Sequence, residues 1–155
     1  SRPTLYARAR SLGIALEEHV NAGRIEVRQI DPAEMSPGEL TEHVRHAVED
    51  GGVSMVVIDS LNGYLYAMPE EQFLILQLHE LLTFLAQLGV VTILVEAQQG
   101  LIGASMRSPV DISYLADGVI LLRHFEAKGR IRRAVSVLKK RSGVHETSIR
   151  EMTMG

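Results

Sequence analysis

The stretch Ser54-Met55-Val56-Val57-Ile58-Asp59-Ser60 decides how this chain is interpreted. Its four consecutive apolar residues fit a strand that is buried on both faces, as strands are in a parallel sheet covered by helices. The run ends in Asp59, and ligands of parallel α/β sheets bind at the carboxyl ends of the strands. The pattern therefore predicts an α/β fold that presents an acid at a ligand-binding edge.

Segments with helical periodicity alternate with apolar or alternating strand-like runs along most of the chain. Helices are predicted at Leu5 to Leu12, Ala15 to Ala22, Pro37 to the Gly51-Gly52 pair, and Glu70 to Leu88. Strands are predicted at Arg24 to Ile30, Met55 to Ile58, Val90 to Val95, and Val119 to Leu122. The segment Glu70 to Leu88 is so rich in Leu, Ile and Phe that we expect it to be buried nearly all round, by its own sheet or by another subunit.

The C-terminal part of the chain has a different pattern. Ala127-Lys128-Gly129 has the composition of a hairpin turn, and the runs Ile131 to Leu138 and Thr147 to Met152 alternate as antiparallel edge strands do. We therefore expect a three-layer α/β sheet with parallel core strands and antiparallel C-terminal edge strands, in a single domain over residues 1–155.

Composition limits the classes of function. The net charge is −3 and the basic residues are dispersed apart from two short clusters, so a nucleic-acid partner is not expected. The chain has no cysteine, which excludes a disulfide scaffold. No apolar stretch reaches the roughly 20 residues of a membrane span, and the start of the chain has no apolar signal core, so we expect a cytoplasmic protein without a membrane partner.

Asp59 is the first candidate for chemistry. An acid at the end of a buried strand can place Mg²⁺, directly or through water, and Ser60 beside it can hydrogen-bond such a water. An acid that only caps a helix or forms a turn has the same pattern, and the two interpretations have about even odds. Glu96 and Gln98 follow the next apolar strand, where they could sense a γ-phosphate or orient an attacking water, or belong to a surface loop.

A basic segment near the C-terminus is the second candidate. Lys139, Lys140 and Arg141 lie at a predicted strand end beside a glycine-containing turn that leads to His145. This composition suits phosphate oxygens, although a solvated strand end is the commoner explanation. The 155 residues contain no GxxxxGK[ST] phosphate loop, the element expected to accompany the acid in a phosphate-transferring ATPase. The chain has the residues of half an ATP site.

Three stretches resemble the KaiC-like branch of the RecA-superfamily ATPases, which includes clock proteins and bacterial signalling ATPases. They are Val56-Val57-Ile58-Asp59-Ser60-Leu61, the run from Ser113 to Arg123, and Val137-Leu138-Lys139-Lys140-Arg141-Ser142-Gly143-Val144-His145-Glu146. The last two are specific to this branch, whereas an acid after an apolar strand occurs throughout the superfamily. The resemblance extends from Ala9-Arg10-Ser11-Leu12-Gly13 to Ile149-Arg150-Glu151, almost the whole chain.

The resemblance implies roles for the candidate residues. Asp59 matches the Walker B acid that helps to place Mg²⁺, and Lys139, Arg141 and His145 match basic positions that reach ATP held mainly by a neighbouring subunit. Family members commonly form hexameric rings with ATP at each subunit boundary. The family's phosphate loop and its pair of catalytic glutamates are expected before Ser1, and the run Glu96-Ala97-Gln98-Gln99 departs from the pattern of some relatives.

The leading hypothesis is that the chain is the C-terminal part of a KaiC-like ATPase domain that, when complete, binds ATP–Mg²⁺ between subunits and hydrolyses it for signalling. The isolated chain is then expected to be weak or inactive in hydrolysis. The alternative is a non-catalytic oligomerisation or protein-interaction module with a degenerate ATP site. A recombinase-like DNA-binding ATPase is a third possibility, against which the net negative charge argues.

Overall fold

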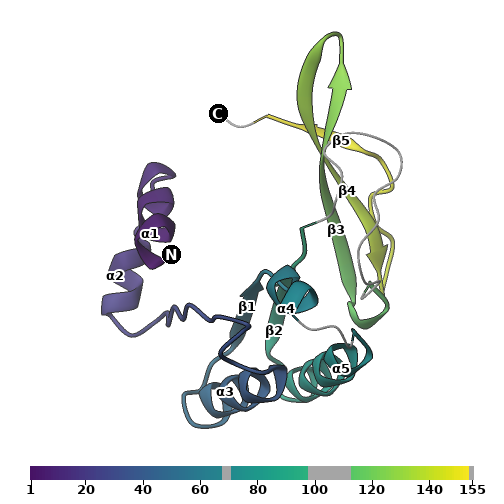
Figure 1. Ribbon diagram of the computed structural model, residues 1–155. Helices are drawn as coiled ribbons and strands as arrows, with labels where there is room; N and C mark the ends of the chain where they lie inside the picture. The colour runs from purple at the N-terminus through teal and green to yellow at the C-terminus, as the bar shows by residue number, and fades with distance from the viewer. Residues whose placement is uncertain (68–70, 98–112, 154–155) are drawn as a thin grey trace. The chain divides into compact units, whose positions relative to one another are not determined.

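The computed structural model describes residues 1–67, 71–97 and 113–153 of the 155-residue chain. Figure 1 shows its helices and strands. The chain divides into two units, Ser1–Ser36 and Pro37–Gly155, and each is described by itself.

The first unit consists of two short helices, α1 (Arg2–Ser11) and α2 (Leu16–Asn21), which contact one another. Gly13 between them has a positive φ of 72°, a conformation that glycine adopts without steric cost. Both helices were predicted from the sequence and are confirmed.

The strand predicted at Arg24 to Ile30 is wrong. The backbone N–H groups of Arg24 and Ile25 both donate to the carbonyl of His19, at the end of α2, rather than to a neighbouring strand. The rest of the segment pairs with no strand among the described residues. Alternation of polar and apolar residues shows that a segment could form a strand. It does not show that a second strand lies beside it to accept its backbone hydrogen bonds.

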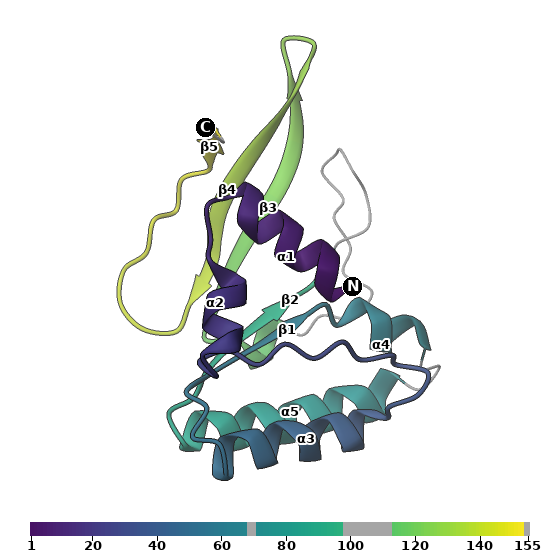
Figure 2. The same cartoon turned by 90° about the vertical axis from the view of Figure 1, so that its left-hand side faces the viewer.

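The second unit begins with a helix-covered parallel pair of strands. Along the chain come α3 (Pro37–Glu49), β1 (Met55–Asp59), α4 (Asn62–Ala67), α5 (Glu71–Gln87) and β2 (Val91–Val95). Strand β2 lies parallel to β1, with Met55 opposite Val91 and Asp59 opposite Val95. The chain returns to the start of the sheet through α4 and α5, as a parallel pair requires. Figure 2 shows α3 and α5 running side by side.

One stripe of α5 supplies four of the buried apolar side chains of the core. Leucines at a spacing of three and four residues are buried on this stripe: Leu74, Leu78, Leu81 and Leu85. Leu81 and Leu85 form a cluster with Val48 of α3, and Val56 of β1 packs against this cluster. The sheet is thereby fixed to the two helices.

Burial is one-sided, contrary to two expectations. Phe73 and Leu76 of α5 are exposed, so the helix is not buried nearly all round. Val57 and Ile93 are also exposed, so the parallel strands are covered on one face rather than on both. The apolar residues on the other face of the strands have no cover from α3 and α5, which pack on the opposite side.

The C-terminal strands form a separate antiparallel sheet. After a short 3₁₀ helix, η1 (Ser113–Leu115), come β3 (Gly118–Ala127), β4 (Arg130–Lys140) and β5 (Arg150–Met152), with β4 in the middle. Lys128 and Gly129 have φ values of 54° and 67°, which a two-residue hairpin turn of the primed type requires. The hairpin and the antiparallel order are confirmed, and β3 continues beyond the predicted Leu122 to Ala127.

The mixed α/β class with a parallel and an antiparallel sheet agrees with the sequence prediction. Among the described residues, no helix has the length and apolar character to cross a bilayer.

The α5 core gives a stability prediction. Leu85 is fully buried, so Leu85→Ala should lower the free energy of unfolding by about 2 to 5 kcal/mol through lost burial and the cavity left behind. Leu76 lies on the exposed side of the same helix, and Leu76→Ala should cost less than about 1 kcal/mol. Urea denaturation followed by circular dichroism measures both. Equal losses in the two variants would contradict the one-sided burial of α5.

Candidate functional site

The carboxyl ends of β1 and β2 bring Asp59 and Glu96 to one edge of the parallel sheet. Asp59 is the last residue of β1 and lies opposite Val95, the last residue of β2, and Glu96 follows directly. Asp59 is exposed and alternates with exposed Met55 and Val57, so its side chain belongs to the uncovered face of the sheet. The acid therefore faces away from the α3–α5 core.

Asn62 ties the two strand ends together. Its Nδ2 donates to the carbonyl of Ala97 at 2.8 Å, and the backbone N–H of Ala97 donates to its Oδ1 at 2.6 Å. The backbone N–H of Leu61 also donates to the carbonyl of Val95 at 3.1 Å. Asn62 is buried and its partner Ala97 is exposed, so these bonds lie at the margin of the protein interior. The turn after Asp59 is thereby held against the end of β2.

Three other residues were predicted at this edge, Ser60, Glu96 and Gln98. Ser60 follows Asp59 through a cis peptide bond and is half-buried. Glu96 is also half-buried and has an interaction of its own. Gln98 lies outside the described residues.

Asp59 fits a Mg²⁺ ion that is held mainly by phosphate. Within the described part of the chain, the Asp59 side chain has neither a hydrogen bond nor an ion pair, and no three His, Cys, Asp or Glu side chains gather to bind a metal by themselves. Mg²⁺ in nucleotide sites is usually held by one or two carboxylates together with phosphate oxygens and water. A single exposed carboxylate at this edge matches that ligand set.

The basic candidates lie at the end of β4 and in the loop that follows it. Lys139 is half-buried opposite Val119 of β3. Arg141, one residue beyond the strand, pairs with Asp117 twice: its Nη1 lies 2.7 Å from the carboxylate Oδ1, and its backbone N–H donates to the Asp117 carbonyl at 2.7 Å. His145 is half-buried in the following loop.

The Arg141–Asp117 ion pair contributes little to the stability of the fold. Both side chains are largely exposed, and ion pairs in such surroundings contribute at most about 1 kcal/mol. The guanidinium can therefore leave the carboxylate for a stronger anion at little cost. Phosphate is such an anion, because its oxygens accept two parallel hydrogen bonds from arginine.

Glu146, next to His145, is held in its charged form. Its carboxylate accepts hydrogen bonds from the Ser148 hydroxyl at 2.8 Å, from Arg150 Nη2 at 2.5 Å and from the Ser148 backbone N–H at 3.2 Å. These bonds, in that order, and the charge of Arg150 lower the pKa of Glu146 to about 2. The loop after β4 is thus held by a carboxylate that stays charged at neutral pH.

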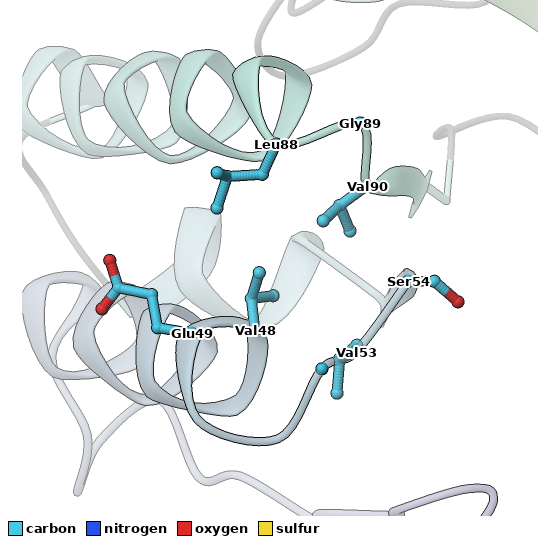
Figure 3. Close-up of a pocket in the computed structure, with 8 residues that line it drawn as sticks. Val48, Glu49, Val53, Ser54, Leu88, Gly89 and Val90 are labelled. Atoms are coloured by element: carbon cyan, nitrogen blue, oxygen red, sulfur yellow. The ribbon is translucent and has the colours of Figure 1, made fainter.

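A shallow depression of about 470 Å³ lies at the opposite end of the parallel sheet. Figure 3 shows Val48 and Leu88 pointing toward one another across it, with Val53 and Val90 at its side. Because Ser54 and Val90 precede the strands, the depression is at the amino ends of β1 and β2, away from Asp59. It is not part of the candidate site.

Comparison with known proteins agrees with these observations. A protein-family model described as "ATPase: KaiC" matches residues 2–155. The chain belongs to the KaiC family of ATPases.

Similar proteins are longer than this chain. The circadian clock protein KaiC3 of Synechocystis is 24% identical over 99% of this chain and 30% of its own length. The circadian clock oscillator protein KaiC of Thermostichus vulcanus is 26% identical over 97% of this chain and 29% of its own length. A KaiC-like protein of Pyrococcus horikoshii OT3 has a solved structure that superposes with a TM-score of 0.78 at 25% identity, covering 99% of this chain and 67% of that one. The solved KaiC-like structure thus shares the fold over almost the entire chain. The chain spans less than a third of the length of the curated relatives that it matches.

Two residues of the site were not singled out from the sequence. Asn62 bonds to a residue 35 positions further along the chain, and no local sequence pattern predicts such a contact. Asp117 lies in one of the stretches that resemble the family, but its pairing with Arg141 depends on the register of β3 against β4.

Asn62 gives a prediction that is specific to this edge. Asn62→Ala removes both hydrogen bonds to Ala97, each worth about 0.5 to 1.5 kcal/mol, so the free energy of unfolding should fall by about 1 to 3 kcal/mol. Asn21→Ala, at an exposed position at the end of α2, is the matched control and should change it by less than about 0.5 kcal/mol. Chemical denaturation measures both variants. Similar values for the two would show that the link between the strand ends adds nothing.

Glu146 gives a pH prediction. Its folded pKa of about 2 lies below the ordinary value of 4.5, so its stabilising effect is complete above pH 4.5 and disappears as the pH falls toward 2. Titration followed by NMR should find this depressed pKa in the native protein and an ordinary one in urea. Ser148→Ala should raise the native value, because it removes the hydroxyl donor. A native pKa near 4.5 would contradict the hydrogen-bonding geometry.

Proposed function

We propose that the complete protein binds ATP–Mg²⁺ at boundaries between its subunits and hydrolyses it for signalling, and that this chain supplies the C-terminal part of the ATPase domain. The observation that carries the proposal is an exposed carboxylate, Asp59, at the carboxyl end of a parallel strand in a KaiC-family chain. Nucleotides bind at such strand ends in α/β proteins.

In this proposal Asp59 holds the metal and Ser60 hydrogen-bonds a water beside it. Mg²⁺ neutralises charge on the phosphate oxygens when it is bound. Glu96 and Gln98, at the end of the neighbouring strand, orient the attacking water or sense the γ-phosphate. The Asn62 link stabilises the relative position of Asp59 and Glu96.

The basic group acts on the nucleotide of the adjacent subunit. Lys139, Arg141 and His145 bind phosphate oxygens there, with Arg141 exchanging Asp117 for phosphate. This arrangement implies a homo-oligomer, and we propose a hexameric ring that works in the cytoplasm with signalling proteins as partners. In this proposal, sequence outside these 155 residues completes a site that the chain holds only in part.

The 155 residues contain no GxxxxGK[ST] sequence. The proposal therefore requires a phosphate loop and a water-activating base from sequence outside these residues. The curated KaiC relatives are long enough to contain such additional sequence, since the chain matches 29% to 30% of their length.

A mixing experiment with the full-length protein tests the proposal. One variant carries Asp59→Asn and the other carries Lys139→Ala with Arg141→Ala, and each alone should lose most ATP hydrolysis, by about 10²-fold or more. Mixed oligomers should recover part of the activity, because some boundaries then combine an intact Asp59 with an intact basic group. Turnover is measured as phosphate release.

The control is a mixture of two preparations that carry the same variant, which should stay inactive. Failure to recover activity in mixed oligomers verified by mass spectrometry would exclude action across a boundary. A full-length protein that forms oligomers but hydrolyses no ATP would favour the interaction module instead.

A further inference from the structure

The candidate metal ligand Asp59 depends on the surrounding backbone for its position. Within the described residues, its side chain makes no hydrogen bond or ion pair that would orient the carboxylate. The carboxylate is therefore placed by the strand before it and by the turn after it. On the strand side, Asp59 lies opposite Val95 in the β1–β2 ladder. How firmly the carboxylate is held then depends on the attachment of the turn.

Three hydrogen bonds tie this turn to the end of β2. The backbone N–H of Leu61 donates to the Val95 carbonyl at 3.1 Å. The Asn62 side chain bonds to the carbonyl and to the N–H of Ala97, at 2.8 and 2.6 Å. Glu96 lies between Val95 and Ala97, so the turn is bonded to the residues on both sides of it. A short path of backbone and one side chain thus connects the two acids of this edge.

Leu61 and Asn62 contribute to this attachment in different ways. Leu61 bonds through its backbone, and its side chain is buried in the protein interior. Both bonds of Asn62 come from the side chain, so a substitution removes them while the backbone bond of Leu61 is retained. Position 62 is therefore where the attachment of the turn can be weakened without changing a residue proposed to touch the metal or the nucleotide.

The amide of Asn62 suits a supporting role beside a metal ligand. It donates and accepts at the same time, which matches the carbonyl and the N–H of one residue, Ala97. It carries no charge, so it does not compete with Asp59 for a cation. Its donor and its acceptor are both engaged by Ala97, which leaves the metal to the carboxylate.

We propose that Asn62 is a positioning residue of the metal site: it holds the turn after Asp59 against β2 and thereby sets how strongly Asp59 binds Mg²⁺. The inference rests on the proposed function, in which Asp59 holds the metal. Residues that orient a metal ligand typically change metal affinity or activity by about 10- to 100-fold when they are replaced. Because Asn62 acts through the backbone, we expect the lower end of this range.

The test measures metal binding by the full-length protein without turnover. Mn²⁺ is the paramagnetic probe of the Mg²⁺ site, titrated by electron paramagnetic resonance in the presence of a non-hydrolysable ATP analogue. Asn62→Ala should weaken Mn²⁺ binding about tenfold. Asn62→Leu, which keeps a side chain of similar size but can neither donate nor accept, should weaken it by a similar factor. Hydrogen exchange at the Ala97 amide should be faster in both variants.

Leu85→Ala is the control for loss of stability. Leu85 belongs to the core cluster beside Val53 and Val90, which precede the strands, so it lies toward the other end of the sheet from Asp59. The variant should lower stability at least as much as Asn62→Ala does and still change Mn²⁺ affinity by less than about twofold. A tenfold loss of Mn²⁺ affinity in this control would attribute the Asn62 effect to stability and overturn the proposal.

A double variant tests whether Asn62 acts through Asp59. Asp59→Asn removes the carboxylate and should strongly weaken Mn²⁺ binding by itself. If Asn62 only positions that carboxylate, adding Asn62→Ala to Asp59→Asn should cause less than about a twofold further loss. A second, independent tenfold loss would mean that Asn62 affects the metal by another route, which contradicts the positioning role.

The outcomes separate this inference from the proposed function. If the wild-type protein binds Mn²⁺ and Asp59→Asn weakens the binding, the metal role of Asp59 stands. Unchanged binding in Asn62→Ala and Asn62→Leu would then overturn the positioning role alone. No binding by the wild-type protein, or no effect of Asp59→Asn, would overturn both. If Asn62→Ala does not fold, Asn62→Leu decides.

Discussion

The packing of α5 against the parallel strands is the contact on which the candidate metal site depends. Leu81 and Leu85 of the helix, together with Val48 of α3, pack against Val56 of β1, and α5 also contacts β2. Burial of these side chains supplies the main driving force that keeps the strands in register. Because β1 and β2 are parallel and of equal length, their carboxyl ends coincide, and Asp59 and Glu96 come to the same edge. A chemical site is thus positioned by apolar contacts that lie on the other face of the sheet.

The sequence was sufficient for elements whose signals are local. The continuous apolar run at Met55 to Ile58 predicted a parallel strand, and Lys128-Gly129 predicted a tight turn, because only a few residue types adopt positive φ easily. Prediction failed where the answer depended on a distant partner. The alternation at Arg24 to Ile30 could not reveal that no described strand lies beside it, and the composition of α5 could not show that only one stripe would be covered.

The candidate site divides in the same way. The place of Asp59 at a strand end could be predicted, because the apolar run that precedes it is a local signal. The roles proposed for Lys139, Arg141 and His145 came only from resemblance to a family. Family membership is now established, but the roles of these residues remain predictions. The contacts of Asn62 and Asp117 arise from chain segments 35 and 24 residues away, and such pairings appear only once the strands are in register.

The pair of hydrogen bonds at Asn62 has a mechanical consequence. A side-chain amide can donate and accept at once, so Asn62 holds the carbonyl and the N–H of the same residue, Ala97. A carboxylate in its place could accept from the N–H but would repel the carbonyl. The two strand ends therefore behave as one rigid piece, and a displacement of the backbone at Ala97 must either break both bonds or pull the turn that carries Asp59 along with it.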